Sequence, residues 1–224
     1  MFESVKLKDI KNLPTEVIRE PSNTRPILLR IKKDHKSAIM KDFNTNSFLF
    51  RNTIGRFLIW RESRAYQKLR GLNGIPKFYR SIDGLAFLME EIQGKDIEAY
   101  CTENKLNDFF FSELYKVVDN FHKHGIAHCD LKRAPNIIVG NNGRPYIVDW
   151  SASITKKGFR IFPLNYIYQR FVQDDLNAII KLKLKYCPEN VTPEDKRKYY
   201  RKSGIEQAIR SIRDRVRELL QKIA

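Results

Sequence analysis

Short runs of apolar or alternating residues dominate the first part of the chain. Residues 26–31 and 37–43 are two such runs, and the polar stretch Lys32–Lys36 separates them. Runs of this kind indicate β-strands, and a polar break of this length is typical of a hairpin turn. A third run, Leu85–Ile92, predicts another buried strand, and Gln93-Gly94 after it is a candidate hinge.

Two other segments repeat their apolar residues at the spacing of a helix. One extends from Ile54 to Leu69, and the other lies between Asn107, a candidate N-cap, and Gly125 beyond its end. The residues expected on the buried faces are Ile54, Leu58, Ala65, Tyr66 and Leu69 in the first helix, and Phe110, Leu114, Val117, Val118 and Phe121 in the second.

A second hairpin is predicted further along the chain. Ile137–Val139 and Tyr146–Val148 are apolar strands, and Asn141-Asn142-Gly143 joins them. Asparagine and glycine tolerate positive φ, so this turn sequence is a strong signal for a tight hairpin.

Two helix starts follow near the C-terminal end. They are Thr192-Pro193-Glu194-Asp195 and Ser203-Gly204-Ile205-Glu206, and the second has a capping-box pattern. The last helix carries one apolar stripe, which is more typical of a core-facing helix than of a partner surface. The stripe consists of Ile205, Ala208, Ile209, Ile212, Val216, Leu219, Leu220 and Ile223.

The chain contains no internal repeat or low-complexity linker, which favours one domain over residues 1–224. The elements divide it into a β-rich N-lobe at about residues 15–92 and a mainly helical C-lobe at 93–224 that ends in a basic helical tail. The predicted fold class is therefore α+β and bilobal, with a small antiparallel β N-lobe and a reduced, mainly helical C-lobe.

Composition bears on the size of the core and on the cellular compartment of the protein. The chain has 224 residues, of which 42% are hydrophobic, and this is enough to bury one good core. Its three cysteines have unrelated spacings, typical of neither a disulfide framework nor a zinc site. No apolar run approaches the roughly 18 residues that span a bilayer. We therefore expect a cytoplasmic protein with no transmembrane segment.

The formal net charge of +16 predicts an anionic partner. The basic tail has two interpretations, which both stay open: a solvated helix face, or a patch that binds a lipid surface or nucleic acid. A lipid partner would place the protein at the inner membrane face. The basic residues of this region are Lys181, Lys183, Lys185, Lys196, Arg197, Lys198, Arg201 and Lys202.

The residues best suited to catalysis and metal binding flank the second hairpin. The segment His128–Asn136 precedes it and Asp149-Trp150-Ser151 follows it. Together they contain two carboxylates, one amide and one lysine. Phosphoryl transfer requires a group that orients the attacking hydroxyl, oxygen ligands for magnesium, and positive charge against the phosphates. These two segments can supply all three.

The order of strand lysine, helix glutamate, His-x-Asp-Leu loop, asparagine and hairpin aspartate resembles the catalytic set of the protein-kinase-like superfamily. The resemblance covers about residues 20–155. Three motifs are similar to a compact bacterial branch close to RIO kinases and lipopolysaccharide-core kinases: Trp60-Arg61-Glu62, Gly74-Ile75-Pro76 and Asp149-Trp150-Ser151-Ala152. The resemblance implies a protein-kinase-like fold that uses ATP and magnesium. It also implies transfer of the γ-phosphate to a hydroxyl of protein Ser/Thr or of a lipopolysaccharide-type sugar.

The resemblance also implies roles for single residues. Asp130 matches the catalytic carboxylate, and Lys132 matches a lysine aimed at the γ-phosphate. Asn136 and Asp149 match the magnesium ligands, while His128 braces the loop. The residues implied for ATP binding are Lys41 and its helix partner Glu62, Met89 with the backbone of Glu90 to Ile92 at the adenine, and Ser22, Asn23, Thr24 and Arg25 at the phosphates.

The sequence departs from the superfamily pattern in four respects, one of which is that no Ala-Pro-Glu motif follows Asp149. Asp130 and Asn136 are six positions apart, whereas the common loop has five, so one residue is inserted. Cys129 replaces the loop arginine, which argues against control by a phosphorylated activation segment. The stretch Glu20–Arg25, where a glycine-rich loop is expected, contains no glycine.

These departures keep two other hypotheses open. One is a pseudokinase that binds nucleotide and docks on a partner through its basic tail. The other is an RNA-associated ATPase similar to RIO proteins, suggested by the positive charge. The acceptor itself has no signature in the sequence.

Overall fold

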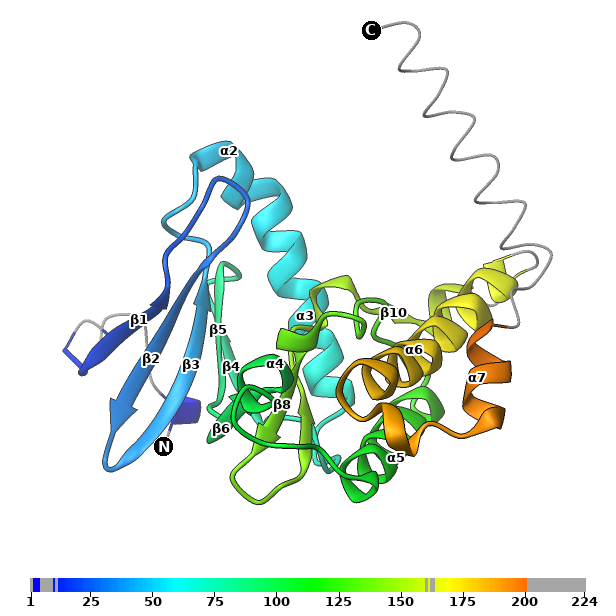
Figure 1. Ribbon diagram of the computed structural model, residues 1–224. Helices are drawn as coiled ribbons and strands as arrows, with labels where there is room; N and C mark the ends of the chain where they lie inside the picture. The colour runs from blue at the N-terminus through cyan, green and yellow to red at the C-terminus, as the bar shows by residue number, and fades with distance from the viewer. Residues whose placement is uncertain (1, 5–9, 11, 160, 162–163, 201–224) are drawn as a thin grey trace, which may run out of the picture.

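A computed structural model describes residues 2–4, 10, 12–159, 161 and 164–200. Within these ranges the chain is a mixed α+β structure, in which an antiparallel sheet lies beside a group of helices (Figure 1). The main sheet has five strands in the order β1-β2-β3-β5-β4. Their bounds are Thr15–Arg19 for β1, Ile27–Lys33 for β2, Lys36–Asp42 for β3, Phe78–Ile82 for β4 and Ala86–Glu90 for β5. The predicted α+β class is confirmed.

The β2–β3 hairpin forms where the apolar pattern predicts it. Its turn consists of Asp34 and His35, whose φ angles of 46° and 61° suit a tight hairpin. Successive side chains of a strand point to opposite faces, so Met40 and Lys41 are separated. Met40 enters an apolar cluster, and Lys41 points to the face where the helix α3 (Arg56–Lys68) lies.

Apolar side chains cover both faces of the main sheet. On one face Met40 and Leu88 pack in a cluster that also contains Phe2 and Ile10 from the start of the chain. On the other face Phe87 belongs to a larger cluster, which continues through α3 into the helical part of the molecule. One core therefore joins the sheet to the helices, and its burial is the main favourable term in folding.

A long helix connects β3 to β4. It comprises α2 (Phe48–Phe50), a π-helical turn (Arg51–Gly55) and α3 (Arg56–Lys68), so it starts before the predicted Ile54. A π-turn inserts one extra residue into the helical repeat and rotates the residues on either side of it. Ile54, which was predicted to be buried, is consequently 49% exposed. Ala65, Tyr66 and Leu69 are buried as predicted.

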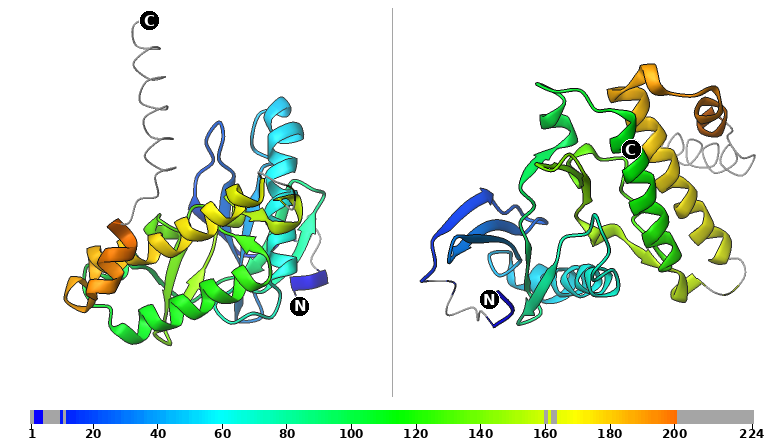
Figure 2. Two further views of the ribbon diagram at one scale, coloured as in Figure 1. Left: turned by 90° about the vertical axis from the view of Figure 1, so that its right-hand side faces the viewer. Right: turned by 90° about the horizontal axis from the view of Figure 1, so that it is seen from below.

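The helical part contains α5 (Asp108–Lys123) and α6 (Leu164–Tyr186), which run side by side (Figure 2). The predicted N-cap of α5 is confirmed, because Asn107 Oδ1 accepts a hydrogen bond from the Phe110 N–H at 3.0 Å. The five apolar residues predicted to be buried in this helix are all buried. Between β5 and α6 the chain also forms the helix α4 (Ile97–Tyr100) and the strands β6 (Gly94–Asp96), β7 (Ile126–Ala127), β8 (Ile137–Gly140), β9 (Pro145–Ile147) and β10 (Ile154–Thr155).

The β8–β9 hairpin is also confirmed, and the loop after α3 is fixed against it. The Gly74 carbonyl accepts a hydrogen bond from the Ile147 N–H at 2.8 Å. Gly74 has a φ of +79°, and a Cβ at this position would lie 2.4 Å from Val117 Cγ2 on α5. A glycine is therefore required where this loop crosses both the hairpin and α5.

The first predicted helix start near the C-terminal end is confirmed as α7 (Pro193–Tyr200). Thr192 Oγ1 accepts a hydrogen bond from the Asp195 N–H at 3.0 Å, and Asp195 Oδ2 accepts one from the Thr192 N–H at 3.1 Å. This reciprocal pair is a capping box. The second predicted start at Ser203 and the apolar stripe of Ile205–Ile223 lie outside the described residues.

Lys183, one of the residues of the predicted basic patch, is an internal residue. Its side chain is buried, and its Nζ lies 3.4 Å from Asp108 Oδ1 and 3.6 Å from Asp195 Oδ2. It therefore ties α6 to the beginnings of α5 and α7. No helix in the described part of the chain combines the length and the apolar character needed to cross a membrane.

Candidate active site

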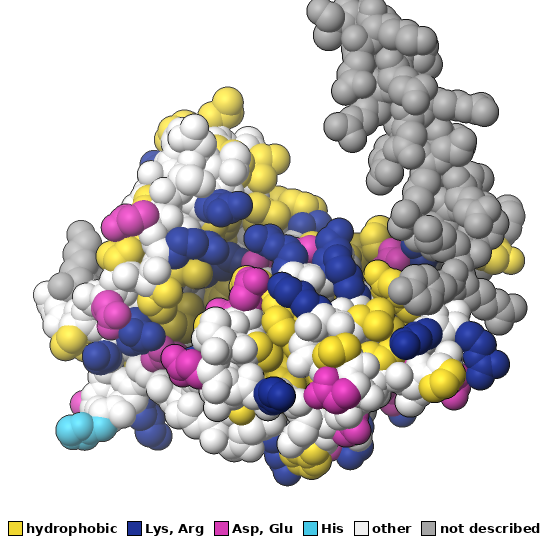
Figure 3. Space-filling model, in the orientation of Figure 1, with side chains coloured by type: hydrophobic (Ala, Val, Ile, Leu, Met, Phe, Trp, Pro, Cys, Tyr) yellow, Lys and Arg dark blue, Asp and Glu magenta, His cyan; other side chains and the backbone are white. Residues whose placement is uncertain are grey.

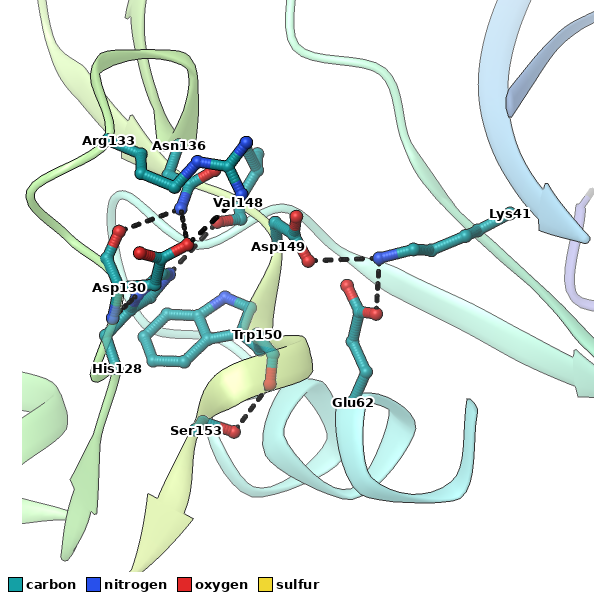
Figure 4. Close-up of polar contacts among 10 residues, drawn as sticks. All are labelled: Lys41, Glu62, His128, Asp130, Arg133, Asn136, Val148, Asp149, Trp150 and Ser153. Carbon is teal, nitrogen blue, oxygen red and sulfur yellow. Dashed lines mark hydrogen bonds and ion pairs between the residues drawn. The ribbon is translucent and has the colours of Figure 1, made fainter. Parts of the chain in front are cut away.

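Lys41 on β3 joins two carboxylates from distant parts of the chain (Figure 4). Its Nζ donates to Glu62 Oε2 at 2.7 Å and to Asp149 Oδ1 at 3.0 Å. Glu62 comes from α3, and Asp149 follows β9. The predicted pairing of Lys41 with Glu62 is therefore formed, and Asp149 shares the same ammonium.

Burial and neighbouring charge act on these three groups in opposite directions. Burial raises the pKa of Glu62 to about 7, although Lys41 lowers it in part. Burial also opposes ionisation of Asp149, but the charge of Lys41 and hydrogen bonds from Ser151 and Lys41 outweigh it and lower the pKa of Asp149. Burial lowers the pKa of Lys41, but the two carboxylates overcome this effect and raise it. A second cation beside Asp149 would be stabilised by the excess of carboxylate charge.

The raised pKa of Glu62 predicts a pH dependence of folding. Its pKa is about 7 in the folded chain against an ordinary value of 4.5, so the folded state binds the proton more tightly. The stability that Glu62 contributes is therefore present below about pH 4.5 and is lost as the pH rises through 7, a change of about 3 kcal/mol. In urea titrations, the free energy of unfolding of wild type minus that of Glu62→Gln should fall over this range. A difference that is independent of pH would contradict the expectation.

The loop His128–Asn136 brings Asp130, Arg133 and Asn136 together. Asn136 Nδ2 donates to the Asp130 carbonyl at 2.9 Å and to Asp130 Oδ2 at 3.4 Å. Arg133 Nη1 donates to Asp130 Oδ2 at 3.4 Å. Since the amide nitrogen of Asn136 faces Asp130, its Oδ1 remains as an acceptor for a cation.

The donors present fit a magnesium ion shared with phosphates. The Asp149 carboxylate and the Asn136 amide line the same cavity, and both are the hard oxygen ligands that magnesium prefers. Among the described residues no group of three or more His, Cys, Asp or Glu side chains could form a metal cage. A site of two protein ligands matches the way magnesium is held together with a nucleotide, where water and phosphate complete the coordination.

A buried carboxylate on α6, Asp175, holds the start of the loop. Its Oδ2 accepts a hydrogen bond from the His128 N–H at 2.7 Å and lies 3.0 Å from His122 Nε2, while its Oδ1 accepts one from the Cys129 N–H at 3.0 Å. Cys129 has a φ of 69°, which is costly for a residue with a Cβ. These contacts keep the backbone in a strained bend directly before Asp130.

His128 and Trp150 hold the two site segments against each other. The Asp130 N–H donates to His128 Nδ1 at 3.3 Å, and His128 Nε2 lies 3.1 Å from the Val148 carbonyl. A carbonyl can only accept, so His128 Nε2 is the donor in this contact. The Trp150 ring lies 4.7 Å from the His128 ring, centroid to centroid, and is fully buried. This agrees with the predicted role of His128 as a brace of the loop.

A cavity of about 380 Å³ lies between the sheet and the loop residues. Figure 3 shows this hollow with basic side chains gathered around it. One part of its wall is apolar, and another carries the charged groups described above. The lining includes Leu28, Met89 and Val148 on the apolar side, and Arg19, Thr24, Arg25, Lys41, Glu62, Arg133, Asn136, Asp149 and Ser151 on the polar side.

The turn between β1 and β2 contributes to this cavity in part as predicted. Thr24 lines the cavity, whereas Ser22 and Asn23 are not among its lining residues. Their carbonyls accept hydrogen bonds from the buried Asn46 Nδ2 at 2.7 Å and 3.4 Å. Ser22 and Asn23 are therefore in contact with the residue that fixes the turn.

Three other predicted residues lie away from the cavity wall. Glu90 and Ile92, which follow Met89 in the sequence, line a separate surface hollow. The Glu90 N–H is already used, because it donates to the Lys77 carbonyl at 2.7 Å. Lys132 is exposed and is not among the residues that line the cavity. Its neighbour Arg133 lines it instead.

Arg19, Arg133 and Asp175 are site residues that the sequence did not reveal. Arg19 ends an edge strand with no motif around it. Arg133 is brought to Asp130 by the conformation of the loop that contains the inserted residue, which the sequence does not specify. Asp175 lies far along the chain from the loop it holds, in the middle of an ordinary helical segment. The inserted residue before Asn136 was the one available signal, and it did not indicate which side chain would face Asp130.

No protein-family model matches the sequence. The function is therefore inferred from the geometry of the site.

Proposed function

We propose that the protein is an ATP-dependent kinase, which transfers the γ-phosphate of ATP to a hydroxyl group. The observation that carries this proposal is the convergence of Lys41, Asp149 and Asn136 on one cavity, with Asp130 beside them. A protein-kinase-like, bilobal architecture is part of the proposal. In it, residues 15–92 form the N-lobe with Lys41, and residues 93–224 form the C-lobe with the loop.

The cavity has separate places for the base and for the phosphates of a nucleotide. Leu28, Met89 and Val148 offer an apolar surface to the adenine. Lys41 offers its ammonium to the phosphates, and Glu62 keeps that ammonium in position at 2.7 Å. Asp149 and Asn136 would hold magnesium. When bound, this ion neutralises charge that develops on the phosphates during transfer.

Asp130 is placed to act on the acceptor. Its side chain is 24% exposed, so a hydroxyl can approach it from solvent. The hydroxyl oxygen forms a bond to the γ-phosphorus, the bond from that phosphorus to the β–γ bridging oxygen breaks, and ADP leaves with the electron pair. Asp130 orients the hydroxyl and takes its proton.

Two acceptor classes are compatible with this arrangement: a Ser or Thr of a protein, or a sugar hydroxyl of lipopolysaccharide type. Both present an alcohol, and the residues at Asp130 do not distinguish between them. The pseudokinase hypothesis and the RNA-associated ATPase hypothesis remain alternatives, because each also uses a nucleotide cavity.

The test is transfer of label from γ-labelled ATP with magnesium, using the full chain and a cell extract fractionated into protein, lipopolysaccharide and RNA. Label in the protein or lipopolysaccharide fraction supports the proposal. ATP binding without any turnover would instead support a docking pseudokinase. Release of labelled inorganic phosphate that RNA stimulates would support the ATPase.

A further inference from the structure

Guanidinium groups are in excess around the cavity. Four cationic side chains line it, Arg19, Arg25, Lys41 and Arg133, together with the carboxylates of Glu62 and Asp149. Lys41 pairs with both of these carboxylates. Four cations against two carboxylates leave the cavity lining with net positive charge, and such a cluster attracts a multiply charged anion.

The turn between β1 and β2 has few backbone N–H groups to offer to a phosphate. Pro21 and Pro26 have none. The Ser22 N–H donates to the Arg25 carbonyl at 3.1 Å, and the Arg25 N–H donates to the Ser22 carbonyl at 3.3 Å. A loop that cradles phosphate with successive amides needs free N–H groups and close approach of the backbone. Two of the positions from Pro21 to Pro26 lack an N–H and two use theirs within the turn, so side chains supply most of the contacts.

Asn46 fixes the direction in which Arg25 leaves the turn. The Asn46 side chain is buried and its Nδ2 donates to the Ser22 carbonyl at 2.7 Å and to the Arg25 carbonyl at 3.2 Å. The Ser22 and Arg25 carbonyls, at the two ends of the turn, are thus held by the same amide group. The Arg25 side chain is presented to the cavity from a pre-formed turn, which reduces the entropy lost when an anion binds.

Arg19 approaches the same place from the end of β1. Its Nε is buried and has no hydrogen-bond partner among the described residues. Burial lowers the pKa of Arg19, the charges of Asp149 and Glu62 oppose this, and those of Arg25 and Arg133 add to it. A buried donor without a partner, close to two like charges, is costly until an anion occupies the space between them.

Arg133 comes from the catalytic loop on the opposite side. The Arg133 N–H donates to the Asp130 carbonyl at 3.3 Å, and the Asn136 N–H donates to the Arg133 carbonyl at 3.0 Å. This tight turn absorbs the inserted residue and turns Arg133 toward Asp130, although the Arg133 side chain remains 56% exposed. Lys132 is also exposed and does not line the cavity. Figure 4 shows the Arg133 guanidinium above Asp130 and on the side of Asp149.

We propose that Arg19, Arg25 and Arg133 form a guanidinium clamp for the phosphates of a nucleoside triphosphate. Arg19 and Arg25 take the place of loop amides, and Arg133 takes the place expected for Lys132. The inference rests on the proposed kinase function, because it assigns the ligand of the same cavity. Guanidinium groups bind phosphate oxygens in pairs, so three of them suit a triphosphate better than a single phosphate.

The test compares single alanine variants of the full chain in two assays, binding of magnesium–ATP and of adenosine, and label transfer. Arg25→Ala and Arg19→Ala should each weaken ATP binding by about tenfold or more, while adenosine binding stays within about twofold. Arg133→Ala should lower the rate of transfer, and Arg133→Lys should restore part of it. Lys132→Ala tests the adjacent lysine. The matched control is Arg144→Ala, on an exposed arginine that does not line the cavity, and it should leave both assays unchanged.

Several outcomes would overturn the clamp. One is loss of transfer in Lys132→Ala but not in Arg133→Ala. Another is equal weakening of ATP and adenosine by Arg25→Ala, which would indicate a role in folding of the turn. The binding assay separates this inference from the kinase proposal. Arginine-dependent ATP binding without transfer leaves the clamp in place and removes the kinase. Transfer that is insensitive to all three arginines does the reverse.

A second, independent observation concerns the outer side of the long helix. Five large apolar side chains are exposed there: Phe48, Leu49, Ile54, Phe57 and Trp60. Phe48 and Leu49, at the start of the helix, are 74% and 75% exposed. Figure 3 shows hydrophobic side chains gathered at the top of the molecule, where Figure 1 has α2. We name these five residues the aromatic face.

Arginines accompany the aromatic face along its length. The Arg51 guanidinium lies 5.5 Å from the ring centroid of Phe48, that of Arg61 5.2 Å from Phe57, and that of Arg64 5.1 Å from Trp60. The single acidic residue of the helix, Glu62, is buried. The helix therefore combines exposed apolar bulk with these three arginines, of which Arg64 is exposed and Arg51 and Arg61 are partly buried, and with no exposed acidic residue.

We infer that the aromatic face binds an anionic lipid surface. A tryptophan and phenylalanines flanked by arginines are typical of segments that lie in the headgroup region of a bilayer. Single-stranded RNA also stacks on aromatic rings beside arginine, but it makes no use of aliphatic side chains. Leu49 and Ile54 are aliphatic and exposed, and Leu49 lies at the end of the helix that reaches furthest out (Figure 1).

Trp60 provides a direct readout of this inference. The chain has two tryptophans, and Trp150 is fully buried, so a spectral change on binding reports Trp60. Vesicles of phosphatidylglycerol and phosphatidylcholine should shift the emission of the full chain to shorter wavelength and carry it down on sedimentation. The variant Phe48→Ser/Leu49→Ser should bind at least tenfold more weakly. Phe109→Ser, on an exposed phenylalanine of α5, should bind like wild type.

The inference is overturned if vesicles cause neither a shift nor sedimentation at low salt. It is also overturned if pure phosphatidylcholine binds equally well, or if Phe109→Ser matches the double variant. A spectral shift with single-stranded RNA but not with vesicles would assign the aromatic face to nucleic acid. A shift that depends on protein concentration alone would assign it to a second copy of the chain.

Discussion

Replacement of Asp130 by asparagine is expected to lower label transfer roughly a hundredfold to ten-thousandfold, the usual range for loss of a general base. The asparagine side chain is nearly the same shape but cannot take the proton of the acceptor. The fold should persist, because Asn136 also donates to the Asp130 carbonyl at 2.9 Å, and that contact belongs to the backbone. Binding of magnesium–ATP, measured by calorimetry, should remain within about threefold of wild type, since Asp130 acts on the acceptor.

The matched control is Asp119→Asn, which removes a carboxylate on the exposed surface of α5 that pairs with Lys123. An exposed pair of this kind contributes little, so activity and stability should be unchanged. If Asp130→Asn retained more than half of the transfer rate, Asp130 would not be the group that takes the proton, and the kinase mechanism proposed above would fail.

Replacement of Asp175 by alanine is expected to lower the free energy of unfolding by about 3 kcal/mol or more. The carboxylate is 1% exposed and holds two backbone N–H groups and His122. Without it, the N–H groups of His128 and Cys129 lose their partner in a buried place, where an unsatisfied donor is costly. Urea titration measures this loss. Because the bend at Cys129 is strained, we also expect Asp130 to shift and the transfer rate to fall at temperatures where the variant is folded.

Asp174→Asn provides the comparison on the same helix. Asp174 pairs with Arg170 at 2.9 Å on the partly exposed side of α6, so its loss should cost less than about 1 kcal/mol. Equal losses of unfolding free energy for the two variants would show that removing any carboxylate from α6 has the same cost as removing Asp175. In that case the loop would not depend on this carboxylate.

The apolar pattern predicted the elements whose one face is buried. The β2–β3 hairpin, the β8–β9 hairpin and α5 all have clear alternation or helical spacing, and their turns and caps have the residues that such ends require. The strand β1 was not predicted, because its side chains are almost all exposed and give no alternation. The start of the long helix was misplaced because a π-turn interrupts the repeat at Arg51–Gly55. No feature of the pattern signals such a turn.

The site was predictable to the extent that it follows chain order. Lys41 and Glu62 could be paired because a strand lysine precedes a helix glutamate, the order that the resemblance implies. In the structure Lys41 Nζ donates to Glu62 Oε2. Arg19, Arg133 and Asp175 depend on three-dimensional approach between segments that share no local motif. Their roles follow from where an edge strand ends, how an inserted residue is accommodated, and which side of α6 faces the loop.

The closed Lys41–Glu62 contact bears on how the proposed kinase would be controlled. In kinases that are switched by movement of this helix, the pair must first be assembled. Here it is already buried and formed, with 9% and 2% of the two side chains exposed, and α3 is fixed by the core on both sides of Glu62. The kinase proposed above would therefore be competent as soon as it folds. The cell would then govern its output through the amount of protein made and the places where acceptor and enzyme meet.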